Sequence, residues 1–125
     1  MAGPIKVLLG DESASVRLLL GALLRDDDRF AVIGDAACGA DIVDRCSEAD
    51  LVVVDLMLAD IDAFSLIDRL HARRPGLPVV VYAEVDPSYL RAEAASRGAV
   101  GFFARRTDPA QVLDGFASAA NGAGP

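Results

Sequence analysis

The sequence contains no tryptophan, one histidine and two cysteines among its 125 residues. Cys38 and Cys46 are too few for a disulfide framework and form no Cys-x-x-Cys motif, so we expect two reduced thiols in a cytoplasmic protein. No apolar run approaches the roughly 20 residues that span a bilayer, and the amino end lacks the basic start of a signal peptide. These absences exclude a disulfide-stabilised secreted scaffold and a membrane-spanning protein.

Positive charge is also scarce. Twelve basic residues stand against 19 acidic ones, which gives a formal net charge of -7 at pH 7. That balance argues against broad contact with nucleic acid or an anionic membrane, because both bind Lys/Arg-rich surfaces, but it leaves cation binding open. Hydrophobic residues make up 53% of the chain. We therefore expect one globular domain over residues 1–125, with its core in 5–122 and a flexible tail or linker stub at 123–125.

The hydrophobic pattern alternates between two periods. Apolar runs typical of β-strands occupy five short segments, namely 5–9, 30–33, 51–54, 78–82 and 100–103. Helical spacing separates them, most clearly in the stripe Val16, Leu19, Leu20, Leu23 and Leu24. Strands that alternate with helices are typical of a parallel sheet covered on both faces. The sequence therefore predicts an α/β fold with a doubly wound, five-stranded parallel sheet.

Acidic residues follow two of the predicted strands. Asp11 and Glu12 follow the first strand, and Asp55 ends the third. In an open parallel sheet the functional groups lie beyond the carboxyl ends of the strands, so we expect these three carboxylates to converge at one edge if the strands are neighbours. Carboxylates that close together need either a proton or a divalent cation, and oxygen ligands completed by water suit Mg²⁺.

The first turn reads Gly10-Asp11-Glu12-Ser13. A phosphate or dinucleotide site at this turn would use a glycine-rich loop that leads into a helix, whereas the acidic pair repels an anion unless a metal intervenes. This turn argues against a flavin-binding, flavodoxin-like enzyme. A phosphatase with an aspartate nucleophile would need an acid at the place of Ser13, so that enzyme class is also disfavoured.

Taken in order, these motifs resemble the receiver domain of bacterial two-component response regulators, of the kind that precedes a helix-turn-helix output domain. The resemblance extends over residues 5–122. It rests on five features, namely Asp11-Glu12, the strand 51–55, the turn Asp55-Leu56-Met57, the segment 78–83 and the strand 98–105. It implies the strand order 2-1-3-4-5.

The resemblance also implies a function. A partner histidine kinase or phosphotransfer protein would phosphorylate Asp55 in a Mg²⁺-dependent reaction, with the ion held by Asp11, Glu12, Asp55 and the backbone carbonyl of Met57. Arg105 would contact the phosphoryl group, and Ala83 and Phe102 would occupy the two switch positions. The chain would relay its state through protein contacts, to a transcriptional output or through a homodimer, and not as an enzyme.

Several positions depart from the family pattern. Arg105 replaces the family's lysine, and Ala83 replaces a serine or threonine whose hydroxyl would contact a phosphoryl oxygen. Gly10, Ala59 and Ala63 stand where the family has an apolar residue, a proline and a glycine, and Phe102 keeps an aromatic ring without a phenolic hydroxyl.

Two interpretations remain. Either Asp55 is phosphorylated and the response is altered, or the chain is a degenerate receiver that acts through phosphorylation-independent protein contacts. By resemblance, the partner or dimer surface would comprise residues 87–97, 100–103 and 108–120.

Overall fold

The computed structural model describes residues 3–122, so the tail predicted at 123–125 lies outside the described residues. Its strands are β1 (Ile5–Gly10), β2 (Phe30–Ala36), β3 (Leu51–Val54), β4 (Val79–Ala83) and β5 (Gly101–Ala104). All neighbouring strands run parallel, in the order β2-β1-β3-β4-β5. The predicted doubly wound fold and its strand order are therefore confirmed.

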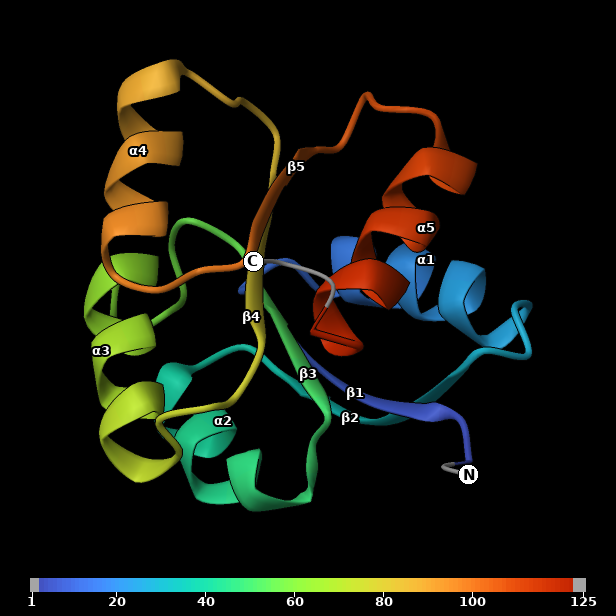
Figure 1. The fold of residues 1–125 in the computed structure, drawn as a ribbon, viewed down its shortest axis with the longest axis horizontal. Coiled ribbons are helices and arrows are strands. Elements are labelled where there is room, and N and C mark those ends of the chain that lie inside the picture. The colour runs from blue at the N-terminus through green and yellow to red at the C-terminus, as the bar shows by residue number, and fades with distance from the viewer. Residues whose placement is uncertain (1–2, 123–125) are drawn as a thin grey trace.

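The helices cover both faces of the sheet (Figure 1). They are α1 (Ala14–Arg25), α2 (Gly39–Arg45), α3 (Ala63–Arg73), α4 (Ser88–Ser96) and α5 (Pro109–Ala120), with a short 3₁₀ helix at Cys46–Glu48. Helices α2, α3 and α4 cover one face, and α1 and α5 cover the other, so the core has two parts. None of the helices described within residues 3–122 combines the length and the apolar composition of a membrane-spanning segment.

Local sequence explains where the helices begin and end. Ser13, Asp62 and Asp108 are N-caps, and the side chain of each accepts a hydrogen bond from a backbone N–H in the first turn that follows. Pro109 occupies the first turn of α5, where its missing N–H costs nothing. Gly98 follows α4 with a φ of 97°, a conformation that glycine adopts without strain.

Helix α1 departs from its predicted burial. Leu20 and Leu24 are buried against the sheet, whereas Leu19 is 67% exposed and Leu23 is 38% exposed. Leu18, outside the predicted stripe, is 71% exposed. The apolar arc of α1 is thus wider than the surface that the sheet covers, and part of it faces solvent.

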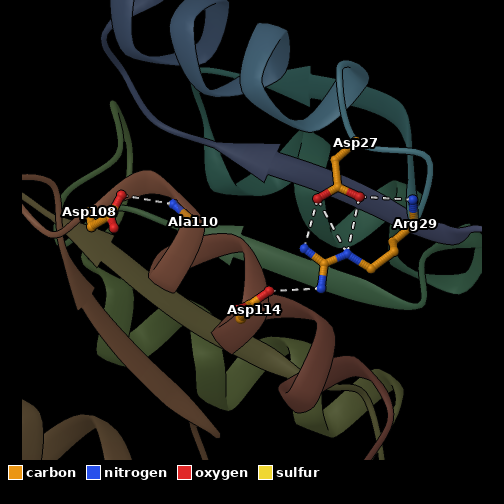
Figure 2. Close-up of polar contacts among 5 residues, drawn as sticks. All are labelled: Asp27, Arg29, Asp108, Ala110 and Asp114. Carbon is orange, nitrogen blue, oxygen red and sulfur yellow. Dashed lines mark hydrogen bonds and ion pairs between the residues drawn. The ribbon is translucent and has the colours of Figure 1, made fainter.

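Helix α5 is connected to the turn between α1 and β2 by one arginine (Figure 2). The Arg29 guanidinium lies 2.7 Å from Asp27 through Nη2 and 2.9 Å from Asp114 of α5 through Nη1. Hydrogen bonds from Arg29 lower the pKa of Asp27 below its usual value of 3.8. The pairs stabilise α5 against the α1–β2 turn, at the end of the sheet where the strands begin.

Candidate functional site

Backbone pairing brings Asp11 and Asp55 to the same edge of the sheet. β1 pairs with β3 in the register Gly10 with Val54, and each of these residues is the last of its strand. The Asp55 N–H donates a hydrogen bond of 2.9 Å to the Gly10 carbonyl, which continues the pairing by one step. Asp11 and Asp55 therefore follow two adjacent strands at equivalent positions, as the sequence predicted.

One side chain joins these two carboxylates. Arg105 comes directly after β5, and its backbone N–H donates to the carbonyl of Ala83 at 2.8 Å. From there its Nη2 reaches 3.1 Å from Asp11 Oδ2 and 3.1 Å from Asp55 Oδ1. Both carboxylates thus share one cationic group. Within residues 3–122, the buried Nε of Arg105 has no hydrogen-bond partner.

Asp11 is the most enclosed of the charged residues of the site, with 5% of the residue exposed. Burial raises the pKa of its carboxyl group above 3.8, the neighbouring charge of Asp55 raises it further, and a hydrogen bond from the Ser13 N–H together with the charges of Arg105 and Arg17 opposes the rise. The edge therefore concentrates negative potential that a cation relieves.

Two residues of the site were missed by sequence reasoning. Arg17 donates a hydrogen bond through Nη1 to the backbone carbonyl of Asp11, and its Nε lies 2.9 Å from Asp35. The Tyr82 ring lies under the Arg105 guanidinium at 5.9 Å, and burial raises the pKa of the Tyr82 phenol. Arg17 had a signal, since it is a basic residue in the helix that follows the acidic pair. Tyr82 had none, because its role depends on where Arg105 points.

The other predicted metal ligands are placed differently. Glu12 is exposed, just before the N-cap of α1. Met57 lies two residues beyond Asp55 and forms an isolated antiparallel bridge with Asp62. Among the described residues, no three histidine, cysteine, aspartate or glutamate side chains gather in a way that could hold a metal ion. The structure brings Asp11 and Asp55 together and leaves Glu12 apart.

Both predicted switch positions are buried. Ala83 ends β4 and is 1% exposed, so its methyl group packs in the core where the family has a hydroxyl. Phe102 is 7% exposed, and Arg91 of α4 covers its ring at 5.6 Å and donates a hydrogen bond to its carbonyl at 3.1 Å. The Phe102 ring is thus buried beneath α4.

The loop after β3 caps two helices. Asp60 accepts hydrogen bonds from Gly39 and Ala40 at the start of α2, and Asp62 caps α3. These hydrogen bonds lower the pKa values of both carboxyl groups below their usual value.

Two family departures lie in closely packed surroundings. A Cβ at Gly10 would lie 3.1 Å from the Leu58 side chain and 3.2 Å from that of Ile42, so a larger residue there would require these side chains to shift by a few tenths of an ångström. Ala63 is the first residue of α3 and is completely buried. Among residues 3–122, no residue other than glycine has a positive φ, so the loop forms without the glycine that the family has at position 63.

A doubly wound sheet with an acid pair and a cation at the carboxyl edge of its strands defines a receiver-like protein. The family model described as "Response regulator receiver domain" matches residues 7–116. The chain belongs to this family, whose members act in two-component signalling.

The chain resembles parts of longer proteins. It is 30% identical over 110 residues to a protein of Pseudomonas aeruginosa named as a transcriptional regulator, covering 86% of the chain and 53% of that protein. It is 33% identical over 114 residues to a protein-glutamate methylesterase/protein-glutamine glutaminase of Rhodopseudomonas palustris, covering 87% of the chain and 31% of that protein. The chain thus spans about half the length of the first relative and less of the second.

Solved structures share the fold. The response regulator domain of Thermotoga maritima CheB superposes with a TM-score of 0.86 at 20% identity, covering 94% of this chain and 97% of that one. A LuxR-family response regulator from Aurantimonas sp. SI85-9A1 superposes with a TM-score of 0.90 at 20% identity, covering 96% of this chain and 87% of that one.

Proposed function

We propose that this chain is a receiver module, with its core in residues 5–122, that accepts a phosphoryl group on Asp55 from a partner histidine kinase or phosphotransfer protein. The observation that carries the proposal is the single Arg105 nitrogen 3.1 Å from both Asp11 and Asp55. Two acids and one cation that meet at the carboxyl edge of a parallel sheet are suited to phosphoryl chemistry.

The difference in solvent exposure between Asp11 and Asp55 supports Asp55 as the acceptor of the phosphoryl group. The Asp55 side chain is 19% exposed, whereas that of Asp11 is 7% exposed and accepts a hydrogen bond from the Ser13 N–H. A donor protein must bring phosphorus within bonding distance of the nucleophilic oxygen, and the more open carboxylate is the one that it reaches. Asp11 then serves as a fixed charge beside the reaction.

The donor atoms fit Mg²⁺. The carboxylates of Asp11 and Asp55 already share one cation, and Mg²⁺ is held by one or two carboxylates while it keeps several waters. Together with the Met57 carbonyl, these residues would hold the ion, and Glu12 would join through a change in its exposed side chain. When bound, the ion neutralises negative charge at the acceptor and at the incoming phosphoryl oxygens.

The residues of the chain have distinct tasks in the transfer. A carboxylate oxygen of Asp55 attacks phosphorus, the P–N bond to the donor histidine breaks, and the imidazole nitrogen keeps the electron pair, which yields an acyl phosphate on Asp55. Arg105 faces the phosphoryl oxygens, and its buried Nε, unpartnered among the described residues, offers a further donor. Ala83 contributes no hydroxyl, so one contact to the product is absent.

A second function is favoured by the same arginine. The Arg105 guanidinium neutralises Asp11 and Asp55 without a phosphoryl group or metal, and Ala83 removes one contact that would sense phosphorylation. Both features suit a degenerate receiver that signals through phosphorylation-independent protein contacts. In either case any catalysis would be limited to its own phosphorylation and dephosphorylation, so we do not propose an enzyme.

The proposal extends to the location of the receiver module in the cell and to its partners. The net charge of -7 disfavours direct contact with nucleic acid, and we propose a cytoplasmic protein that passes its state to other proteins. A transcriptional output fits the name of the Pseudomonas relative, which is longer than this chain.

The experiment is a titration with phosphoramidate or beryllofluoride in the presence and absence of Mg²⁺. After phosphoramidate, intact-mass measurement should show one added phosphoryl group that requires Mg²⁺ and is absent from Asp55→Ala, and beryllofluoride should bind the parent chain only when Mg²⁺ is present. If millimolar Mg²⁺ does not bind and Asp55→Ala behaves as the parent chain does, the phosphorylation-independent function replaces the proposal.

A further inference from the structure

The aromatic surface under Arg105 is built from two strands and one helix. Tyr82 of β4 pairs in register with Phe103 of β5. Both rings form T-shaped contacts with Phe116 of α5, at centroid distances of 6.1 Å for Tyr82 and 5.3 Å for Phe103. Phe116 is completely buried, so the Tyr82 ring lies against a well-packed part of the core.

The same register brings Arg105 beside Tyr82. Side chains two residues apart on a strand point to the same face, so Arg105 follows Phe103 on the face that carries Tyr82. The Arg105 N–H donates to the Ala83 carbonyl at 2.8 Å, which extends the pairing of β4 with β5 by one residue. The guanidinium carbon lies 5.9 Å from the centroid of the Tyr82 ring. A planar guanidinium can lie along an aromatic ring, which the compact ammonium of a lysine cannot.

The polar contacts of Arg105 do not by themselves fix its guanidinium. Both ion pairs, to Asp11 and to Asp55, use the same nitrogen, Nη2. Nε is buried and has no hydrogen-bond partner within residues 3–122. A planar group held through one nitrogen can still tilt about that nitrogen, so a further contact is needed to keep it across both carboxylates. The Tyr82 ring supplies a contact of that kind.

We propose that Tyr82 is a positioning residue for Arg105, and that its ring holds the guanidinium across Asp11 and Asp55. While Arg105 is held there, its charge occupies carboxylate oxygens that a Mg²⁺ ion would use. The Tyr82 ring therefore sets how strongly the arginine competes with the metal. This consequence for Mg²⁺ rests on the proposed function, whereas the positioning of Arg105 does not.

The alternative is that Tyr82 only fills space beside Phe116. Two substitutions separate the roles, because Tyr82→Leu keeps an apolar side chain without a ring and Tyr82→Phe keeps the ring without the hydroxyl. A side chain that only packs can be replaced by leucine without effect on Arg105. Circular dichroism and thermal melts identify any variant that loses the fold.

The first measurement follows the Arg105 Nε–H by NMR of the whole chain without metal. The signal is assigned by its loss in Arg105→Lys. Its exchange with water should quicken at least about fivefold in Tyr82→Leu, because a mobile guanidinium exposes the buried nitrogen, and less than about twofold in Tyr82→Phe. The Nε–H of Arg17, which donates to Asp35 at 2.9 Å, is the internal control and should exchange as in the parent chain.

Unchanged exchange of the Arg105 Nε–H in Tyr82→Leu overturns the proposal. So does equal acceleration in Tyr82→Leu and Tyr82→Phe, because the ring would then not be the group that holds Arg105. Acceleration of the Arg17 Nε–H to the same extent also overturns it, because the substitution would then loosen the whole site.

The second measurement is the Mg²⁺ affinity, by isothermal titration. Tyr82→Leu should bind Mg²⁺ at least about threefold more tightly than the parent chain, since the freed guanidinium competes less well. It should add nothing further in Arg105→Ala, because the two residues act as one unit. Tyr89→Leu is the matched control, because Tyr89 is the second of the two tyrosines, lies on α4 and is 72% exposed, and it should leave the affinity unchanged.

The two measurements distinguish failure of the positioning role from failure of the proposed function. A gain in Mg²⁺ affinity from Tyr82→Leu that persists in Arg105→Ala overturns the positioning role, because the ring would then act on the metal without the arginine. If neither the parent chain nor any variant binds Mg²⁺, the proposed metal site fails. The exchange of the Arg105 Nε–H then decides by itself whether Tyr82 positions Arg105.

Discussion

Arg105 and Asp11 form an ion pair with Nη2 3.1 Å from Oδ2, although β5 and β1 are separated in the sheet by β3 and β4. The pair is enclosed, because the Arg105 side chain is 26% exposed and that of Asp11 is 7% exposed. The length of the arginine side chain allows it to cross the carboxyl edge of the sheet. Arg105, which stands where the family has a lysine, thus connects the end of β5 to the end of β1.

Removal of Arg105 should change Mg²⁺ affinity and the rate of phosphorylation in opposite directions. We expect Arg105→Ala to bind Mg²⁺ more tightly, because the guanidinium no longer competes for the oxygens of Asp11 and Asp55. Phosphorylation by phosphoramidate should slow by about tenfold or more, because a cation that faces the phosphoryl oxygens is lost. Isothermal titration with Mg²⁺ and intact-mass kinetics measure the two effects.

Arg106→Ala is the control for this variant, since Arg106 is adjacent in sequence, is 74% exposed and pairs with Asp86 away from the acid pair. It should leave both quantities unchanged. Weaker Mg²⁺ binding in Arg105→Ala would contradict the idea of competition.

Neutralising Asp11 should stabilise the fold in a pH-dependent way. Because burial raises the folded-state pKa of Asp11, the stability contributed by its protonated form is complete below 3.8 and is lost as pH rises through the raised value. Asp11→Asn keeps an acceptor for the Ser13 N–H and has no charge to bury. We expect it to be more stable than the parent chain by about 1 kcal/mol at neutral pH, and the difference should vanish in acid.

Urea unfolding between about pH 3 and about pH 8 measures this difference. Glu12→Gln removes one charge from an exposed neighbour and controls for net charge. A constant difference across the pH range would show that Asp11 ionisation is not its source.

A hydroxyl at position 83 should strengthen the response to phosphorylation. Ala83→Ser places a hydrogen-bond donor at the end of β4, where the family uses one to contact a phosphoryl oxygen. We expect a larger change in protection of β4 and α4 on addition of phosphoramidate with Mg²⁺, at a cost of about 1 kcal/mol for burying the hydroxyl. Hydrogen exchange measures the change.

Ala94→Ser in α4 is the matched control, because Ala94 and Ala83 are both 1% exposed. It should cost similar stability and leave the response unaltered. Equal responses in the two serine variants would rule out a specific contact from position 83.

The pairs of Arg29 with Asp27 and Asp114 should stabilise the chain only in dilute salt (Figure 2). We expect Arg29→Gln to lower the melting temperature by a few degrees at about 0.02 M salt and by less at about 0.5 M, because salt screens exposed charges. Differential scanning calorimetry at the two concentrations measures this. Arg69→Gln, on α3 at the opposite face of the sheet, should show a smaller dependence on salt.

Much of the fold could be predicted from the local pattern of hydrophobic and helix-capping residues. The run at 51–54 coincides with β3, and Asp108-Pro109 opens α5 as its capping chemistry predicts. Acidic residues directly after strand-forming runs indicated the carboxyl edge as the site. These features depend on residues close in sequence, where period and capping preferences act.

The side-chain partners could not be predicted in the same way. Leu19 and Leu23 follow the spacing of a buried stripe and are nevertheless exposed, because the rotation of α1 against the sheet determines which part of its apolar arc is covered. Asp60 is a loop acid by sequence and a cap of α2 in space, because two loops meet after folding.

The sequence by itself determined the alternation of strands and helices, the helix caps and the acidic residues after β1 and β3. Only the tertiary structure decided that Asp11 and Asp55 share Arg105, that Glu12 stays apart and that three leucines of α1 remain uncovered. The physical reason is the separation along the chain over which each kind of interaction acts. Backbone preferences act within a few residues, whereas an ion pair or a buried surface depends on where packing places groups from distant parts of the chain.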